Sequence, residues 1–296
     1  MGSMTKNTVV VGVDASVEAL VAARYGLRQA QARGCELLLV HAYPIPPMNT
    51  PLPGDTFTCL QEAGQALLDN VVSQLDIPRT VPVATMLEQT APVILLQRAA
   101  ESAHMIVIGQ HHSSWLERLM VGSVASPLCC KAACPVVIVP RRWQPGATDQ
   151  QPVVVATDGE AAPEAALQLA CEQATLLHTS VIALHAMPVG ASPAEVTAHE
   201  QHIAKLVAGC TVARPQTPIT VRTVHGDPAA AISEASRSAS LVVLGTPHTR
   251  RIGSWSRSVA RLVLKHAECP IAVVPRREQI KKVITHAAEG GELLPS

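Results

Sequence analysis

Short apolar runs recur along the chain, and longer segments with helical spacing of their apolar residues separate them. The first runs cover residues 8–14, 37–44, 105–109 and 134–140, and they are rich in valine, isoleucine and leucine with little polar alternation. Uninterrupted runs of this kind are typical of strands that are buried on both faces of a parallel sheet. Alanine- and leucine-rich segments such as 16–33 predict helices between them. The pattern therefore predicts alternating strands and helices.

The second part of the chain repeats the first. The run TVVVGVD ends at Asp14 and the run PVVVATD ends at Asp158, so these positions are 158 − 14 = 144 residues apart. The run LVHAYP at 39–44 returns as ALHAMP at the same offset, and the run that ends at Gly109 returns 136 residues later, at Gly245. The run that begins with Cys-Pro also returns, after 135 residues. Four matched blocks in one order indicate an internal duplication.

Each copy has the predicted order β-α-β-α-β-α-β-α-β. Pro92 and Pro228 fall near the start of the third helix of each copy, where the missing N–H of proline is harmless. We therefore predict an α/β protein of two tandem doubly wound domains, each with a parallel sheet and helices on both faces. The predicted parts are a first domain at 7–142, a linker at 143–151, a second domain at 152–277 and a tail at 278–296.

Composition narrows the possible functions. Hydrophobic residues make up 48% of the chain but aromatic residues only 2%, so the cores must be aliphatic. Lys+Arg and Asp+Glu both total 23, which argues against a nucleic-acid or membrane-surface role that depends on net charge. No apolar run reaches the roughly 18 residues that span a bilayer, and no signal peptide is visible, so we expect a cytoplasmic protein.

The eight cysteines and the histidines give no strong metal or disulfide signal. The cysteines lack a second paired motif, so we expect buried structural thiols. His199 and His202 are three residues apart on a predicted helix, and no third ligand accompanies them, so a solvated helix face is the favoured interpretation. No hydrolase elbow or Walker loop is present, and we predict no catalytic residue and no metal site.

Candidate ligand-binding residues of the first half fall at the ends of predicted strands. Asp14 follows the first strand, Ala42 ends the second, Gly109 ends the fourth, and Gly122 and Ser123 open the fourth helix. The carboxyl ends of parallel strands meet at one edge, where ligands bind beside the point at which strand order reverses. Free N–H groups at a helix start bind phosphate, and a carboxylate accepts hydrogen bonds from a ribose or an adenine amine. This edge is therefore predicted to bind a nucleotide.

A purely structural role also fits these residues. An aspartate after a strand often caps the next helix, so Asp14 and Asp158 suit that role equally well. Ser123 can likewise serve as a helix cap alone.

These residues resemble the universal stress protein family. The resemblance rests on VVVGVDAS at 9–16, LLLVHAYP at 37–44, IVIG at 106–109 and GSVAS at 122–126 followed by CPVVIVP, and it covers nearly all of residues 7–277. It implies a tandem universal stress protein of the actinobacterial type, with five parallel strands in the order 3-2-1-4-5 in each half. It also implies that the last strands pair across a dimer interface, here between the two halves.

The nucleotide site is implied by the same resemblance. The ATP-binding branch of the family has the pattern Gly, two residues, Gly, nine residues, then Gly-Ser or Gly-Thr. Gly109 and the pair Gly122-Ser123 fit this pattern, whereas His112 replaces the middle glycine. The implied ligand is ATP or another adenine nucleotide, with Mg²⁺ accompanying it. The implied lining residues are Asp14, the backbone at Ala42, Gly109, Gly122, Ser123 and Val124.

The second half departs further from the pattern. Its weaker candidates for the same site are Asp158, Ala186, Gly245, Arg257 and Ser258. His248 replaces the middle glycine, and Arg257-Ser258 stands in place of the final pair with one residue deleted. Arg257 can reach a phosphate in one interpretation. We favour the other, in which this copy has lost binding and keeps the fold.

Three functions follow from these features. The first is a non-enzymatic stress-response or signalling protein that binds an adenine nucleotide mainly in its first half and acts on an unknown protein partner. The second is an interaction scaffold with vestigial pockets, and the third and weakest is a slow ATPase. We expect no nucleic-acid or membrane partner, and an internal pseudo-dimer that can form a homodimer.

Overall fold

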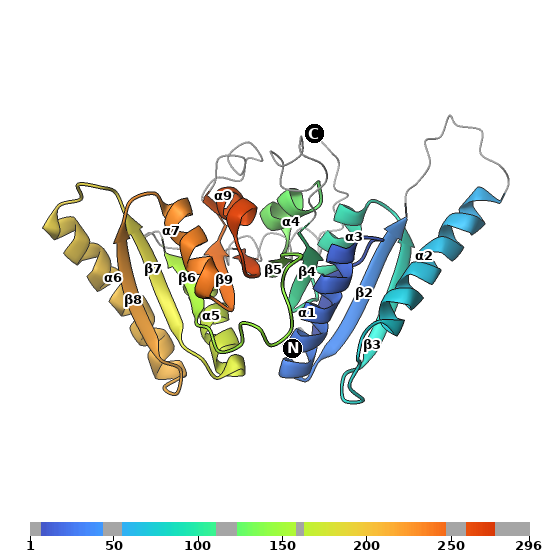
Figure 1. Ribbon diagram of the computed structural model, residues 1–296, viewed down its shortest axis with the longest axis horizontal. Coiled ribbons are helices and arrows are strands. Elements are labelled where there is room, and N and C mark those ends of the chain that lie inside the picture. The colour runs from blue at the N-terminus through green and yellow to red at the C-terminus, as the bar shows by residue number, and fades with distance from the viewer. Residues whose placement is uncertain (1–6, 44–54, 111–122, 158–162, 247–258, 276–296) are drawn as a thin grey trace, which may run out of the picture.

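The computed structural model describes residues 7–43, 55–110, 123–157, 163–246 and 259–275, in which strands and helices alternate in the predicted order (Figure 1). The first half contains β1 (Thr8–Gly12), α1 (Val17–Arg33), β2 (Glu36–Tyr43), α2 (Thr56–Ser73), β3 (Val83–Gln89), α3 (Pro92–Ala99), β4 (Met105–Gly109), α4 (Ala125–Lys131) and β5 (Val136–Val139). The second half contains β6 (Val153–Thr157), α5 (Pro163–Leu177), β7 (Val181–Met187), α6 (Pro193–Ala213), β8 (Ile219–His225), α7 (Pro228–Ala235), a short 3₁₀ turn at Ser236–Ser238, β9 (Leu241–Gly245), α9 (Val259–His266) and β10 (Ile271–Val274).

All ten strands form one sheet. Its order is β3-β2-β1-β4-β5-β10-β9-β6-β7-β8, so each half has the order 3-2-1-4-5 that the family resemblance implied. Pairing is parallel within each half, whereas β5 and β10 pair antiparallel, with Val137 opposite Ala272. Figure 1 shows the consequence: the two halves lie side by side around β5, with α2 and α6 at opposite ends. The predicted pairing of the halves through their last strands is confirmed.

Helices cover both faces of the sheet, because alternate strand residues point to opposite faces. Val9 and Val11 are fully buried in one core cluster with residues of α1, α2, α5 and α6. Val10 belongs to a second cluster, with residues of α3, α4, α7 and α9. The runs are uninterruptedly apolar because both faces of these strands are covered.

The first helix illustrates why its sequence folds as it does. The hydroxyl oxygen of Ser16 accepts a hydrogen bond from the N–H of Ala19 at 3.1 Å and caps α1. Gly34 ends the helix in the left-handed conformation, with φ of 61°. Gly26 brings α1 close to the sheet, since a Cβ there would lie 2.4 Å from Cγ2 of Val11.

The segment predicted as a linker packs against α1. The Trp143 ring is buried and meets Tyr25 edge to face, with ring centroids 5.1 Å apart. Asp149 forms an ion pair with Arg28. Contacts at both ends of the segment therefore hold it on the first half.

No helix in the described ranges is both long enough and apolar enough to span a bilayer. The predicted tail, 278–296, lies outside the residues that the structure describes.

Candidate functional site

The strands and helices bring the described candidate residues of the first half to one edge of the sheet. Asp14 follows β1, Ala42 lies near the end of β2, and Gly109 ends β4. Gly12 pairs with Val40. Because adjacent strands lie roughly 4.8 Å apart, Asp14 lies beside Ala42, near the carboxyl end of β2.

Strand order reverses at this edge. The strand β1 is followed by α1 on one face of the sheet, and β4 is followed along the chain by α4 on the other. Since β1 and β4 are neighbours, their carboxyl ends diverge to opposite faces. This is the topological arrangement in which open parallel sheets bind ligands.

Asp14 does not cap α1 directly. Its Oδ1 accepts a hydrogen bond from the N–H of Ser16 at 2.9 Å and a second, short one from the Ser16 hydroxyl, which itself caps the helix. The Asp14 side chain is exposed, and within the described part of the chain no donor reaches its second oxygen, Oδ2. One carboxylate oxygen thus orients the cap, and the other is directed to solvent.

His41 holds the ends of β1 and β2 together. Its Nδ1 lies 2.7 Å from the carbonyl oxygen of Val13, so that nitrogen carries the proton and donates. The backbone N–H of Val13 donates to the carbonyl of Val40 at 2.9 Å. In the second half, His185 makes the equivalent contact with the carbonyl of Thr157 at 2.8 Å. Both histidines therefore link the ends of two neighbouring strands.

Gly109 is required by a close backbone approach. A Cβ at this position would lie 2.5 Å from the carbonyl oxygen of Glu18, in the first turn of α1. The glycine therefore lets the start of α1 lie directly over the end of β4. This contact gives the sequence pattern a packing reason in addition to any contact with a ligand.

The fourth helix begins later than the sequence predicts. The helix α4 starts at Ala125 and its N-cap is Val124, without a side-chain hydrogen bond. Ser123 lies one position earlier, in an exposed turn, so its suggested role as the N-cap is wrong. Val124 is half-buried against the core cluster of α3 and α4, which positions the turn but leaves the Ser123 side chain accessible.

Several candidates lie outside the described residues. They are Gly122, His112, Asp158, His248, Arg257 and Ser258. In the second half the described candidates are therefore Ala186, half-buried near the end of β7, and Gly245 at the end of β9.

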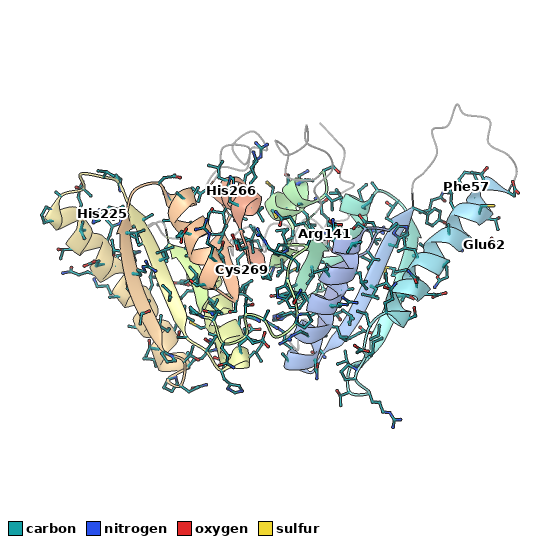
Figure 2. All side chains as sticks on the ribbon, viewed as in Figure 1. Phe57, Glu62, Arg141, His225, His266 and Cys269 are labelled. Carbon is teal, nitrogen blue, oxygen red and sulfur yellow. The ribbon has the colours of Figure 1, made fainter. Side chains whose placement is uncertain are left out.

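Arg141 is a cation at this edge that the sequence interpretation did not single out as a site residue. It follows β5, its side chain is 68% exposed, and its Nη1 lies 3.8 Å from Oε1 of Glu18 (Figure 2). The motif Pro-Arg-Arg occurs after the last strand of both halves, which was the available signal. An arginine on this rim supplies positive charge for an anionic ligand.

The histidines of α6 contact the sheet. The ring of His199 stacks on that of His185, with centroids 5.0 Å apart. Nδ1 of His199 and Nε2 of His202 are buried without a hydrogen-bond partner, so the predicted solvated helix face is wrong for these atoms. In the described ranges, no three histidine, cysteine or acidic side chains are placed to hold a metal ion.

The cysteines are free thiols, and most are buried. Burial raises the pKa of Cys129, and burial raises the pKa of Cys269 to about 12 (Figure 2). A high pKa suppresses the thiolate, so these thiols are structural rather than nucleophilic. Cys59, on α2, is exposed.

Comparison with known proteins identifies the family. The model of the universal stress protein family matches this chain twice, at residues 6–140 and 150–275. The universal stress protein Rv2623 of Mycobacterium tuberculosis strain H37Rv is 33% identical over 288 residues, which cover 90% of this chain and 95% of that protein. Universal stress protein Rv2005c of the same strain is 31% identical, over 90% of this chain and 96% of its own length.

Solved structures agree on the fold. A universal stress protein from Archaeoglobus fulgidus DSM 4304 superposes with a TM-score of 0.68 at 17% identity, over 92% of this chain and 97% of that one. A putative universal stress protein from Pseudomonas aeruginosa UCBPP-PA14 gives a TM-score of 0.59 at 17% identity, over 96% and 99% of the two chains. With the family matched in both halves, the chain belongs to the universal stress protein family as a tandem, two-domain α/β member.

Proposed function

We propose that this protein binds an adenine nucleotide, with ATP as the preferred ligand. The site lies at the carboxyl edge of β1 and β4 in the first half, and the bound nucleotide is not hydrolysed. The observation that carries the proposal is the convergence of Asp14, Ala42 and Gly109 at the point where strand order reverses. Binding would serve a stress-response or signalling role through a protein partner.

The chemistry of the edge suits a nucleotide. Among the described residues Ser16 bonds Oδ1 of Asp14 alone, which leaves Oδ2 to accept a hydrogen bond from a ribose hydroxyl or an adenine amine. The exposed Arg141 and the turn at Ser123 offer a cation and polar donors for phosphate. Mg²⁺ would accompany ATP as its counter-ion.

The geometry also favours binding over catalysis. His41, which lies at this edge, uses Nδ1 to donate to the carbonyl of Val13, which makes it a structural link between two strands. Asp14 is exposed and in contact with a helix cap. Neither has the buried or paired setting that tunes a general base.

Titration calorimetry of the full chain with ATP, ADP and AMP tests the proposal. A hydrogen bond to a charged group contributes about 1.5–3 kcal/mol, so Asp14→Asn should weaken ATP binding by roughly 10- to 150-fold. Ser16→Ala is the matched control, because it removes the contact with Oδ1 and leaves Oδ2 in place. Folded wild-type protein that gives no heat with any nucleotide would contradict the proposal and favour the scaffold.

The location is tested by two paired substitutions. Ala42→Trp fills the first-half edge and should abolish binding, whereas Ala186→Trp alters the matching position of the second half and should leave it unchanged. A phosphate-release assay on the wild type tests the absence of turnover. Release of phosphate that depends on Asp14 would identify a slow ATPase instead.

A further inference from the structure

The two halves meet through a polar cluster on the α1–α5 side of the sheet. The guanidinium of Arg33 is the centre: its Nε donates to Oε1 of Glu172 at 3.0 Å, and its Nη2 donates to Oε1 of Gln173 at 3.0 Å. Nε2 of His104 lies 3.1 Å from the same Glu172 oxygen. The Arg33 side chain is only 8% exposed, whereas those of Glu172 and His104 are 31% and 27% exposed, so these contacts between different halves are partly desolvated.

The cluster is anchored in the first half as well. Nη1 of Arg33 forms a short hydrogen bond with Oε1 of Gln29. Gln29 and Gln173 are both buried, and they are 173 − 29 = 144 residues apart, which makes them equivalent positions of the duplication. One arginine therefore binds the same glutamine of both halves.

The structure supports this equivalence of positions. Gly34 ends α1 with φ of 61°, and His178, 144 residues later, has φ of 53° at the end of α5. Each donates its N–H to the residue three positions earlier, at 3.2 Å in both cases. The offset of 144 therefore holds through the whole of this helix pair.

The charged members of the cluster are not repeated. At the same offset, Leu177 stands in the second half where Arg33 stands in the first, and Glu172 stands where Arg28 stands. At the offset of 136 for the fourth strand, Ser240 stands where His104 stands. The second half thus supplies the carboxylate, and the first half supplies Arg33 and His104 that contact it.

The equivalent contacts, with the roles of the two halves exchanged, have uncharged residues in place of Arg33 and His104. Arg28, Leu177 and Ser240 line one small cavity between the halves, together with both equivalent glutamines. There, Leu177 lies in the position that corresponds to Arg33, and Ser240 in the position that corresponds to His104. The Arg28 charge is met by Asp149 of the segment between the halves.

We infer that this cluster specifies the pairing of the halves: a first half fits a second half, and neither fits a copy of itself. Two first halves in this arrangement would place Arg33 and His104 of one copy against Arg28 of the other. Two second halves would leave the half-buried Glu172 against leucine and serine. Like charges in contact and a partly desolvated carboxylate without a cation both oppose association, so only the mixed pair is satisfied.

This pairing rule gives a reason for the different charged residues in two halves of the same fold. The two halves share a fold, and their last strands meet in an antiparallel ladder that identical halves can also form. Without the charged cluster, a first half could pair with another first half, and a second half with another second half. The cluster selects the partner, whereas the backbone ladder does not.

A cut-and-refold experiment tests the inference on the full chain. A protease site inserted between Gly146 and Ala147, which are exposed, lets the folded protein be cut into paired halves. The cut protein is unfolded in urea and refolded, and native mass spectrometry counts the three possible pairs. Mixed pairs should outnumber each like pair by at least about ten to one. A statistical mixture would overturn the inference.

A gain-of-function variant sharpens the test. Leu177→Arg gives each second half a cation that faces Glu172 of another copy, so pairs of second halves should increase at least about ten-fold. Val212→Arg is the control, since it adds the same charge to the same half at a side chain that is 83% exposed. An equal effect of both variants would show that net charge, rather than the cluster, governs pairing.

If the cut protein does not refold, a double-mutant cycle on the intact chain decides the question. Arg33→Leu, Glu172→Gln and the double variant are compared by urea unfolding. The inference requires a coupling of at least about ten-fold in the unfolding equilibrium constant, as expected for a partly desolvated charged pair. A coupling below about two-fold would overturn it.

Discussion

Replacing Gly109 by alanine is the most specific perturbation that the structure suggests. The new Cβ would lie 2.5 Å from the carbonyl oxygen of Glu18 and 2.6 Å from its carbonyl carbon. Both are backbone atoms in the first turn of α1, so no side chain can rotate out of the way. Either α1 or the end of β4 must move by about 0.9 Å to restore an ordinary contact of 3.4 Å or more.

The expected cost follows from this geometry. Overpacking a close-packed site costs about 1–3 kcal/mol, and the upper part of that range applies because the obstacle is backbone. We therefore expect Gly109→Ala to lower the free energy of unfolding by about 2–3 kcal/mol. For a chain of this size, that corresponds to a fall in Tm of roughly 3–5 °C.

Thermal and urea unfolding, followed by circular dichroism, measure the effect. Gly209→Ala is the matched control: Gly209 lies within α6, and nothing lies within 4 Å of a Cβ there. Alanine should stabilise that helix by up to about 1 kcal/mol. If Gly109→Ala were as stable as the wild type, or if the two variants shifted stability alike, the close approach of α1 to β4 would be refuted.

Three further predictions concern reactivity, pH and capping. Of the eight thiols, Cys59 should react first with a disulfide reagent at neutral pH because it is exposed. Burial and a raised pKa protect Cys129 and Cys269. Several thiols that react at one rate in the folded protein would contradict this prediction. Burial acts to raise the pKa of Glu172, but contact with His104 and the charge of Arg33 outweigh it and lower that pKa. The pKa of Glu172 in the folded state is thus below its unfolded value of roughly 4.3, so the stabilisation by this carboxylate is present above that pH and is lost as pH falls. Glu172→Gln should therefore reduce the slope of the unfolding free energy against pH in the acid range. An unchanged slope would contradict this prediction. Ser16→Ala should cost about 1 kcal/mol in urea unfolding through the lost cap of α1, and a cost below about 0.3 kcal/mol would exclude a capping role.

The fold was predictable because its determinants are local and repeated. Apolar runs such as 8–14 are continuous because helices cover both faces of their strands, and that pattern is readable without coordinates. The duplication fixed the domain count, and the family resemblance supplied the strand order and the pairing of β5 with β10. The domain boundaries themselves stay a prediction.

The candidate site was predictable in position more than in detail. Strand ends placed Asp14, Ala42 and Gly109 at one edge, but the hydrogen bonds of Asp14 to Ser16 could not be deduced, because an aspartate two residues before a serine suits several turns. The start of α4 was misplaced because helix ends vary by one or two residues.

Contacts between distant segments were not predictable from local pattern. Trp143 was assigned to a polar linker, yet its ring packs on Tyr25, since a single aromatic residue in a short segment gives no periodic signal. The contact of Arg33 with Glu172 joins residues 139 positions apart, and its asymmetry shows only when equivalent positions of the two halves are compared.

Equilibrium dialysis of the full chain against radiolabelled ATP tests the central claim most directly. The account predicts one mole of ATP bound per mole of chain, lost in Asp14→Asn and retained in Ser16→Ala. Two moles bound would contradict the assignment to the first half. Folded wild-type protein that retains no ATP at millimolar concentration would contradict nucleotide binding itself.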